Sequence, residues 1–164
     1  MASGGFAIRA ARPEDVPAIV RLIHDLAAYE RAPDECRADP TLLAEHLFGP
    51  KPLVEALVAE ADGLIAGFAL FFHNYSTWLT LPGLYLEDLY VRPEQRGLGI
   101  GKALLVRLAR IAVDRRCGRM EWSVLKWNEP AIGFYRRLGA VAMDEWQVYR
   151  LEGPSLRALG SGPP

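Results

Sequence analysis

The stretch Tyr85-Leu-Glu-Asp-Leu-Tyr-Val91, followed closely by Gln95-Arg-Gly-Leu-Gly-Ile-Gly-Lys102, decides the fold of this chain. An apolar strand with two adjacent acids runs into a turn that has glycines at positions 97, 99 and 101. A helical pattern then continues from about Lys102 to Arg115. The glycines leave backbone N–H groups uncovered at the N-terminus of this helix. With the helix dipole, those groups form an anion site suited to a diphosphate.

Two other phosphate-binding patterns do not fit this turn. A P-loop would end in Gly-Lys-Ser/Thr, which is missing here. A dinucleotide fingerprint would need a further glycine three residues after the second one, where this chain has Lys102.

Composition sets outer limits on the fold and on the partners. The chain has 164 residues, 51% of them hydrophobic and 24% charged, which is typical of one globular domain with a proper core. A net charge of −1 argues against a broad nucleic-acid surface. The longest apolar run, Leu64–Phe72, is too short to span a bilayer, and the N-terminus lacks a signal-peptide pattern. Cys36 and Cys117 lie far apart in the sequence, and neither the cysteines nor the three histidines have a metal-binding spacing. This predicts a reduced, cytoplasmic protein without a disulfide or a metal site.

Hydrophobic periodicity and turn residues predict a single domain over residues 1–164, with a core at about 6–151 and a flexible tail at 160–164. The predicted strands are 6–10, 53–59, 64–72, 85–91, 119–125, 140–143 and 146–151. The predicted helices are 13–29, 40–47, 99–115 and 129–138. Asp62-Gly63 predicts a tight hairpin, and residues 73–82 are expected to form a loop. This order predicts a mixed α/β sheet with helices on both faces.

A second motif lies about thirty residues beyond the glycine turn. It reads Trp127-Asn-Glu-Pro-Ala-Ile-Gly-Phe-Tyr-Arg-Arg-Leu-Gly-Ala140. Asn128 is placed to cap a helix that Gly139 stops.

The two motifs together resemble those of the GNAT N-acetyltransferases. Arg96-Gly-Leu-Gly-Ile-Gly101 is similar to the acetyl-CoA loop of that family, Gln/Arg-x-x-Gly-x-Gly/Ala, and residues 128–140 resemble the helix beside the cofactor. Leu86-Glu-Asp88, Trp127-Asn-Glu-Pro130 and Leu26-Ala-x-Tyr29-Glu30 look like the diamine/polyamine branch, including its thialysine-acetylating relatives. The resemblance implies a mixed, mostly antiparallel sheet, acetyl-CoA as cofactor, and a homodimer.

The resemblance also implies where the cofactor binds. The fourth predicted strand should separate from its neighbour and offer backbone groups to the pantetheine arm. The expected cofactor-binding residues are Leu89, Tyr90, Val91, Arg96, Gly97, Leu98, Gly99, Ile100, Gly101, Lys102, Asn128, Pro130, Ala131 and Tyr135.

Acetyl transfer to an amine has requirements that particular side chains could meet. Tyr135 could protonate the departing thiolate, whose pKa is near that of cysteine, about 8.5; the alternative is an aromatic packed in the core. Glu87 could take the proton from the acceptor, directly or through a water, and Asp88 should point to the opposite face of the strand; the alternative is a solvated acid pair. The expected acceptor-binding residues are Tyr29, Glu30, Glu87, Asp88, Glu121 and Trp122, although surface charge explains Glu30 about as well and core packing suits Trp122 better.

These residues favour an N-acetyltransferase that acts by direct transfer to a small cationic amine, namely a diamine, a polyamine or a lysine-like side chain. Two alternatives stay open at this point. One keeps the reaction but changes the acceptor to an amino acid, an antibiotic or a protein amine. The other is a non-catalytic acyl-CoA-binding sensor.

Overall fold

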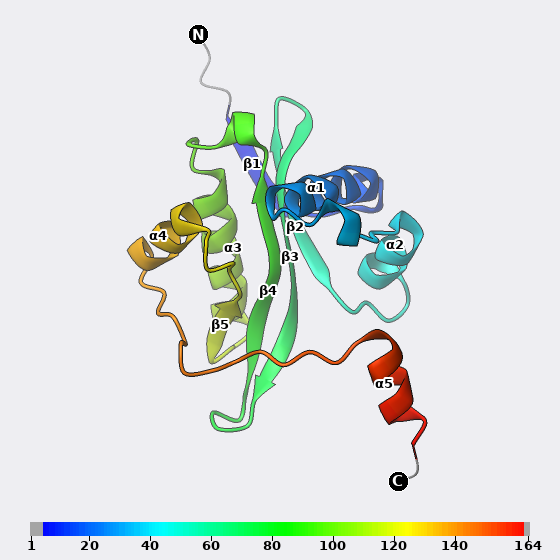
Figure 1. Ribbon diagram of the computed structural model, residues 1–164. Coiled ribbons are helices and arrows are strands. Elements are labelled where there is room, and N and C mark those ends of the chain that lie inside the picture. Colours follow the sequence, from blue (N-terminus) through cyan, green and yellow to red (C-terminus); the bar gives the residue numbers. More distant parts are fainter. Residues whose placement is uncertain (1–4, 163–164) are drawn as a thin grey trace. The chain divides into compact units, whose positions relative to one another are not determined.

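The computed structural model describes residues 5–162, which form two compact units divided after Leu125, each treated by itself below (Figure 1). The expectation of a signal-free N-terminus falls largely on residues 1–4, and the end of the expected flexible tail falls on residues 163–164; both lie outside the described part. Within that part, no helix has the length and the apolar character needed to cross a membrane.

A five-stranded sheet forms the centre of the first unit, in the order β1-β2-β3-β4-β5. The strands are β1 (Phe6–Ala10), β2 (Glu55–Ala61), β3 (Leu64–Ser76), β4 (Leu81–Val91) and β5 (Arg119–Trp122). The first four pair antiparallel, and β4 pairs with β5 in parallel. The predicted mixed sheet is confirmed.

The two hairpins differ in how well the sequence predicted them. Asp62 and Gly63 join β2 to β3 with φ values of 51° and 75°, as the tight-turn signal predicted. The predicted loop over residues 73–82 is wrong in most of its length, because His73 to Ser76 continue β3 and pair with residues 81–84 of β4. The sequence of these polar residues does not itself indicate a strand, and their hydrogen-bonded pairing with β4 stabilises the extended conformation.

Helices cover both faces of the sheet, as predicted (Figure 1). On one face α1 (Val16–Tyr29) and α2 (Pro40–Phe48) contribute Ile19, Leu22 and Leu47 to a core that includes Val58, Phe68 and Tyr90. The other face is covered by α3 (Ile100–Asp114). Gly101 of α3 lies close to β4, because a Cβ added to it would be 3.8 Å from the Leu89 side chain and 3.9 Å from that of Val91. Neighbouring residues of β4 therefore serve opposite faces: Leu89 and Val91 face α3, and Asp88 and Tyr90 face α1.

Short polar signals set the helix boundaries. The Asp39 carboxylate accepts hydrogen bonds from Thr41 N at 2.8 Å and Leu42 N at 2.9 Å, so it caps α2. A single 3₁₀ turn, Pro13–Asp15, precedes α1. Asp15 is 5% exposed and receives two hydrogen bonds from Arg9 of β1, which fixes the start of α1 against the sheet.

The second unit contains α4 (Glu129–Arg137) and α5 (Gly153–Gly160). Asn128 Oδ1 accepts from Ala131 N at 3.4 Å and Gly139 follows the helix with φ 88°, so both predicted boundary signals of α4 hold. The predicted strands 140–143 and 146–151 are wrong, because residues 140–152 contain no strand. Their alternating apolar pattern needs a partner strand, and the described part of this unit offers none. The predicted loose tail from residue 160 begins inside α5, a helix that was not predicted.

Candidate active site

The glycine-rich turn presents a row of free backbone donors. Gly99 caps α3 in the left-handed conformation, with φ 85°. The amides of residues 97 to 102 donate no hydrogen bond to any acceptor among residues 5–162. Free N–H groups at a helix N-terminus stabilise a bound anion, and a diphosphate needs several of them at once.

A free sheet edge leads away from this turn. Pairing between β4 and β5 ends at Leu86 and Trp122, so no described strand lies beside the outer edge of β4 from Glu87 to Val91. Arg92 N donates to Ala66 O on the β3 side, and because antiparallel bonding alternates, Leu89 and Val91 turn their backbone groups to the open edge. The resemblance predicted this separation of strands, which leaves polar backbone for an amide-containing chain.

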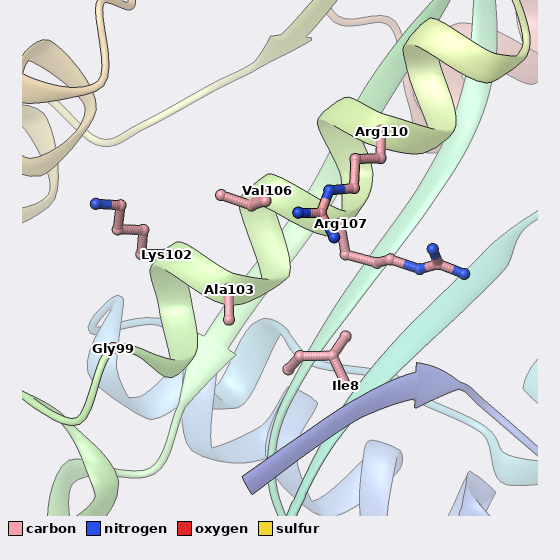
Figure 2. A pocket seen from close by; sticks show the side chains of 7 residues that line it. All are labelled: Ile8, Gly99, Lys102, Ala103, Val106, Arg107 and Arg110. Atoms are coloured by element: carbon pink, nitrogen blue, oxygen red, sulfur yellow. The ribbon is translucent and has the colours of Figure 1, made fainter.

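A positively charged groove runs along α3 from Gly99 to Arg110 (Figure 2). It encloses about 520 Å³ beside Gly99 and Ile8, and its cations are Lys102, Arg107 and Arg110. Figure 2 shows Lys102 and Arg107 extending in different directions from the helix. No ion pair forms between these cations and any acid of the described chain. The positive charge beside the free amides suits an anionic donor. Sequence reasoning missed Arg107 and Arg110, although Arg110 lies eight residues after Lys102, a spacing that puts both on one side of a helix.

Three acids gather around Asp88 of β4. A bulge between Leu70 and Phe71 leaves Glu87 as an extra residue on β4, and Asp88 follows it. Burial, together with the nearby carboxylates of Glu87 and Glu30, raises the pKa of Asp88 to about 6. Burial also raises the pKa of Glu30, which directly follows α1. The structure therefore brings three of the predicted acceptor-binding residues together: Glu30, Glu87 and Asp88.

Tyr29, another predicted acceptor-binding residue, stacks against a cation of the protein itself. The Arg96 guanidinium carbon lies 5.0 Å from the centroid of the Tyr29 ring and 5.4 Å from that of Tyr90. Arg96 Nε donates to the Val91 carbonyl at 2.9 Å. No pattern in the sequence signalled this arrangement, because its members come from α1, β4 and the turn after β4.

Glu121 and Trp122 lie where β5 still pairs with β4, opposite Tyr85 and Leu86. The Glu121 carboxylate forms an ion pair with Arg119 at 2.8 Å and accepts a hydrogen bond from Asn74 at 3.4 Å. Glu121 therefore has an ion-pair partner and a hydrogen-bond partner within the protein.

The remaining predicted cofactor-binding residues belong to the second unit. Pro130, Ala131 and Tyr135 lie on α4, and Asn128 caps that helix. The Tyr135 carbonyl accepts from Leu138 N and Ala140 N, which closes the helix end.

Comparison with known proteins identifies the class to which this fold and site belong. The family model described as acetyltransferase (GNAT) family matches residues 19–140, so the chain belongs to this family. It is an acetyl-CoA-dependent N-acetyltransferase, and the free amides, the open edge and the basic groove fit such a donor.

Several relatives extend over most of the chain. The chain is similar to thialysine N-epsilon-acetyltransferase of Bos taurus, with 38% identity over 93% of this chain and 95% of the relative. It is similar to L-ornithine N5-acetyltransferase NATA1 of Arabidopsis thaliana, with 34% identity over 93% of this chain and 86% of the relative. Among solved structures, an integron cassette protein of Vibrio cholerae aligns with a TM-score of 0.80 at 27% identity, covering 96% of this chain and 98% of that one.

Proposed function

We propose that the enzyme acetylates the terminal amine of a small acceptor that carries a second cationic group, such as a diamine, a polyamine or a lysine-like amino acid. The observation that carries this proposal is the gathering of Glu30 and Glu87 around Asp88, close enough for both carboxylates to raise the pKa of Asp88. A second cation would relieve the repulsion among these carboxylates and lower the raised pKa of Asp88. The relatives named thialysine N-epsilon-acetyltransferase and L-ornithine N5-acetyltransferase support the same class of acceptor.

Different side chains would accept the proton of the acceptor amine and donate a proton to the departing thiolate. An alkyl ammonium has a pKa near about 10.4, so it must lose a proton before its nitrogen can attack. Asp88 or Glu87 would accept that proton at a carboxylate oxygen, directly or through a water. Acetyl-CoA supplies an activated acyl group, so the protein needs no nucleophile of its own. Tyr135 would donate the phenolic proton to the leaving sulfur.

The domain organisation, the oligomeric state and the cellular location are also proposed. The family match crosses the boundary between the two units at residue 125, which supports one acetyltransferase domain over residues 1–164. We propose a cytoplasmic homodimer without a nucleic-acid partner. Gel filtration with light scattering would test the dimer.

A second cation on the acceptor is expected to raise kcat/KM by about tenfold or more. The matched comparison is putrescine against butylamine, which has the same carbon chain and lacks the second amine. The advantage should shrink between about 0.1 M and about 1 M salt, because the Debye length falls from about 10 Å to about 3 Å. Glu30→Gln should raise KM for putrescine and leave butylamine unchanged. Equal kcat/KM for the two amines at both salt concentrations would remove the basis for a dicationic acceptor.

A change of slope near pH 6 is expected in the pH profile of kcat/KM for putrescine. Above about pH 6, Asp88 is ionised and only the acceptor limits the rate, so log kcat/KM should rise by about one per pH unit. Below about pH 6, Asp88 is also protonated, so the slope of log kcat/KM against pH should approach about two. Asp88→Asn should remove the change of slope and lower the rate above it.

Glu87→Gln is the matched control, because it neutralises the neighbouring acid. If Asp88 is the base, Glu87→Gln should keep the change of slope. A profile that loses its change of slope in Glu87→Gln and keeps it in Asp88→Asn would assign the base to Glu87.

A further inference from the structure

The Arg96 side chain is held between two aromatic rings from different elements. Its guanidinium lies over Tyr29 at the end of α1 and over Tyr90 on β4, with its Nε on the Val91 carbonyl. A planar guanidinium can stack on rings and donate in its own plane at the same time, which an ammonium cannot do. The position therefore depends on arginine and not on positive charge alone.

These contacts place the side chain of Arg96 on the face of the sheet away from α3. Tyr90 is 6% exposed and belongs to the core cluster that α1 covers. The free amides of residues 97 to 102 start α3, which packs on the opposite face beside Leu89 and Val91. The backbone of Arg96 thus leads directly into the free amides of residues 97 to 102, while its side chain lies on the α1 face.

The α1 face at this point carries the acceptor lip, by which we mean Tyr29 and Glu30. Glu30 directly follows Tyr29 and lies close enough to Asp88 to raise its pKa. Any contact that fixes Tyr29 against β4 therefore also fixes the distance between the two carboxylates. Arg96 makes that contact, and only one peptide bond separates it from Gly97.

We infer that Arg96 is a positioning residue that couples donor binding at the glycine-rich turn to the acceptor lip. The inference rests on the proposed function, because it needs an acceptor held by Glu30 and Asp88. A diphosphate on the amides of residues 97 to 102 restrains the backbone that carries Arg96. The restrained guanidinium holds Tyr29, and Glu30 stays beside Asp88. The acceptor then binds more tightly once the donor is bound, and by linkage the donor binds more tightly in the presence of the acceptor.

The competing role for Arg96 is that of a direct phosphate ligand. In that role the guanidinium would leave the tyrosines and turn to the donor. The two roles predict opposite patterns of loss: a positioning residue affects the acceptor, and a phosphate ligand affects CoA.

The first test measures both ligands in Arg96→Lys, which keeps the charge and removes the planar group. KM for putrescine should rise about tenfold, and the Kd for CoA measured by calorimetry should change less than about threefold. Arg92→Lys is the matched control, because Arg92 Nε also donates to a backbone carbonyl, that of Ile65, at 3.0 Å, and Arg92 stacks on no ring of the described chain. It should leave both constants unchanged.

A double-mutant cycle shows whether Arg96 and Tyr29 act together. Tyr29→Leu removes the ring that the guanidinium covers and should also raise KM for putrescine. The variant with both substitutions should be little worse than either alone, because residues in contact are not additive. Fully additive losses would mean that Tyr29 and Arg96 act separately, and the inference would be withdrawn.

A third measurement needs no acceptor. Adding CoA to the wild type should slow amide hydrogen exchange in residues 26–30, and Arg96→Lys should lose this protection while it still binds CoA. Absence of protection in the wild type would overturn the coupling. A tenfold or greater loss of CoA affinity in Arg96→Lys, with an unchanged KM for putrescine, would assign Arg96 to the phosphates instead. If the wild type turned over no dication yet showed the protection, the proposed acceptor would fail and the coupling would survive.

Discussion

Gly99→Val is expected to abolish most of the affinity for CoA while the fold survives. Gly99 caps α3 at φ 85°, and an added Cβ would meet no heavy atom within 4 Å, so the protein alone has room for a side chain. The space that valine would enter borders the free amides, where phosphate oxygens must approach. Losing two charge-assisted hydrogen bonds of about 1.5–3 kcal/mol each lowers affinity by about 10²-fold or more. Calorimetry with CoA measures the loss directly.

Backbone strain has to be separated from this steric effect. A valine with positive φ costs about 1–3 kcal/mol wherever it stands. Gly63→Val is the matched control, because Gly63 has φ 75° in the β2–β3 hairpin and an added Cβ there also meets nothing within 4 Å. Both variants should lose similar stability in a urea titration, and only Gly99→Val should lose CoA binding. Similar CoA affinities in the two variants would show that the turn does not hold the diphosphate.

Tyr135→Phe is expected to lower the turnover number by about 10²-fold with little change in CoA affinity. The substitution keeps the ring and removes only the phenolic proton that the leaving sulfur would take. A single-turnover measurement is the better readout, because slow product release could hide the chemical step in kcat.

A hydroxyl lost elsewhere should have no such effect. Tyr75→Phe serves as the control, because Tyr75 is exposed near the end of the long β3–β4 hairpin. If Tyr135→Phe reacted as fast as Tyr75→Phe in a single turnover, Tyr135 would have a packing role and the proton would come from another source.

Local signals predicted the parts of the site that depend on backbone chemistry. The turn of residues 97 to 102 needs glycines next to a helical pattern, and the Asn128 cap needs one polar side chain. Such features are encoded within a few residues. The sequence therefore predicted them in place.

Other parts depend on residues far apart in the chain and were not predictable in the same way. The stack of Arg96 on Tyr29 and Tyr90 joins three elements, and neither spacing nor composition indicates it. Residues 73–76 became strand because β4 pairs with them, whereas residues 140–151 alternate and yet form none. An alternating pattern favours a strand, but the strand forms only where a neighbouring strand supplies its hydrogen-bond partners. The raised pKa of Asp88 likewise needs Glu30, which stands 58 residues earlier by its number (88 minus 30).

The open edge of β4 also bears on self-association. Unpaired N–H and C=O groups invite a strand from another molecule, and a long flat edge is an aggregation hazard. Here the edge runs only from Glu87 to Val91 among the described residues, with Glu87 and Asp88 at one end. Pro93 stands just past the other end and has no N–H to extend a ladder. The two acids and Pro93 thus limit the exposed backbone to a short edge. A pantetheine arm can bind along this edge, but a strand from another molecule cannot extend its pairing beyond it.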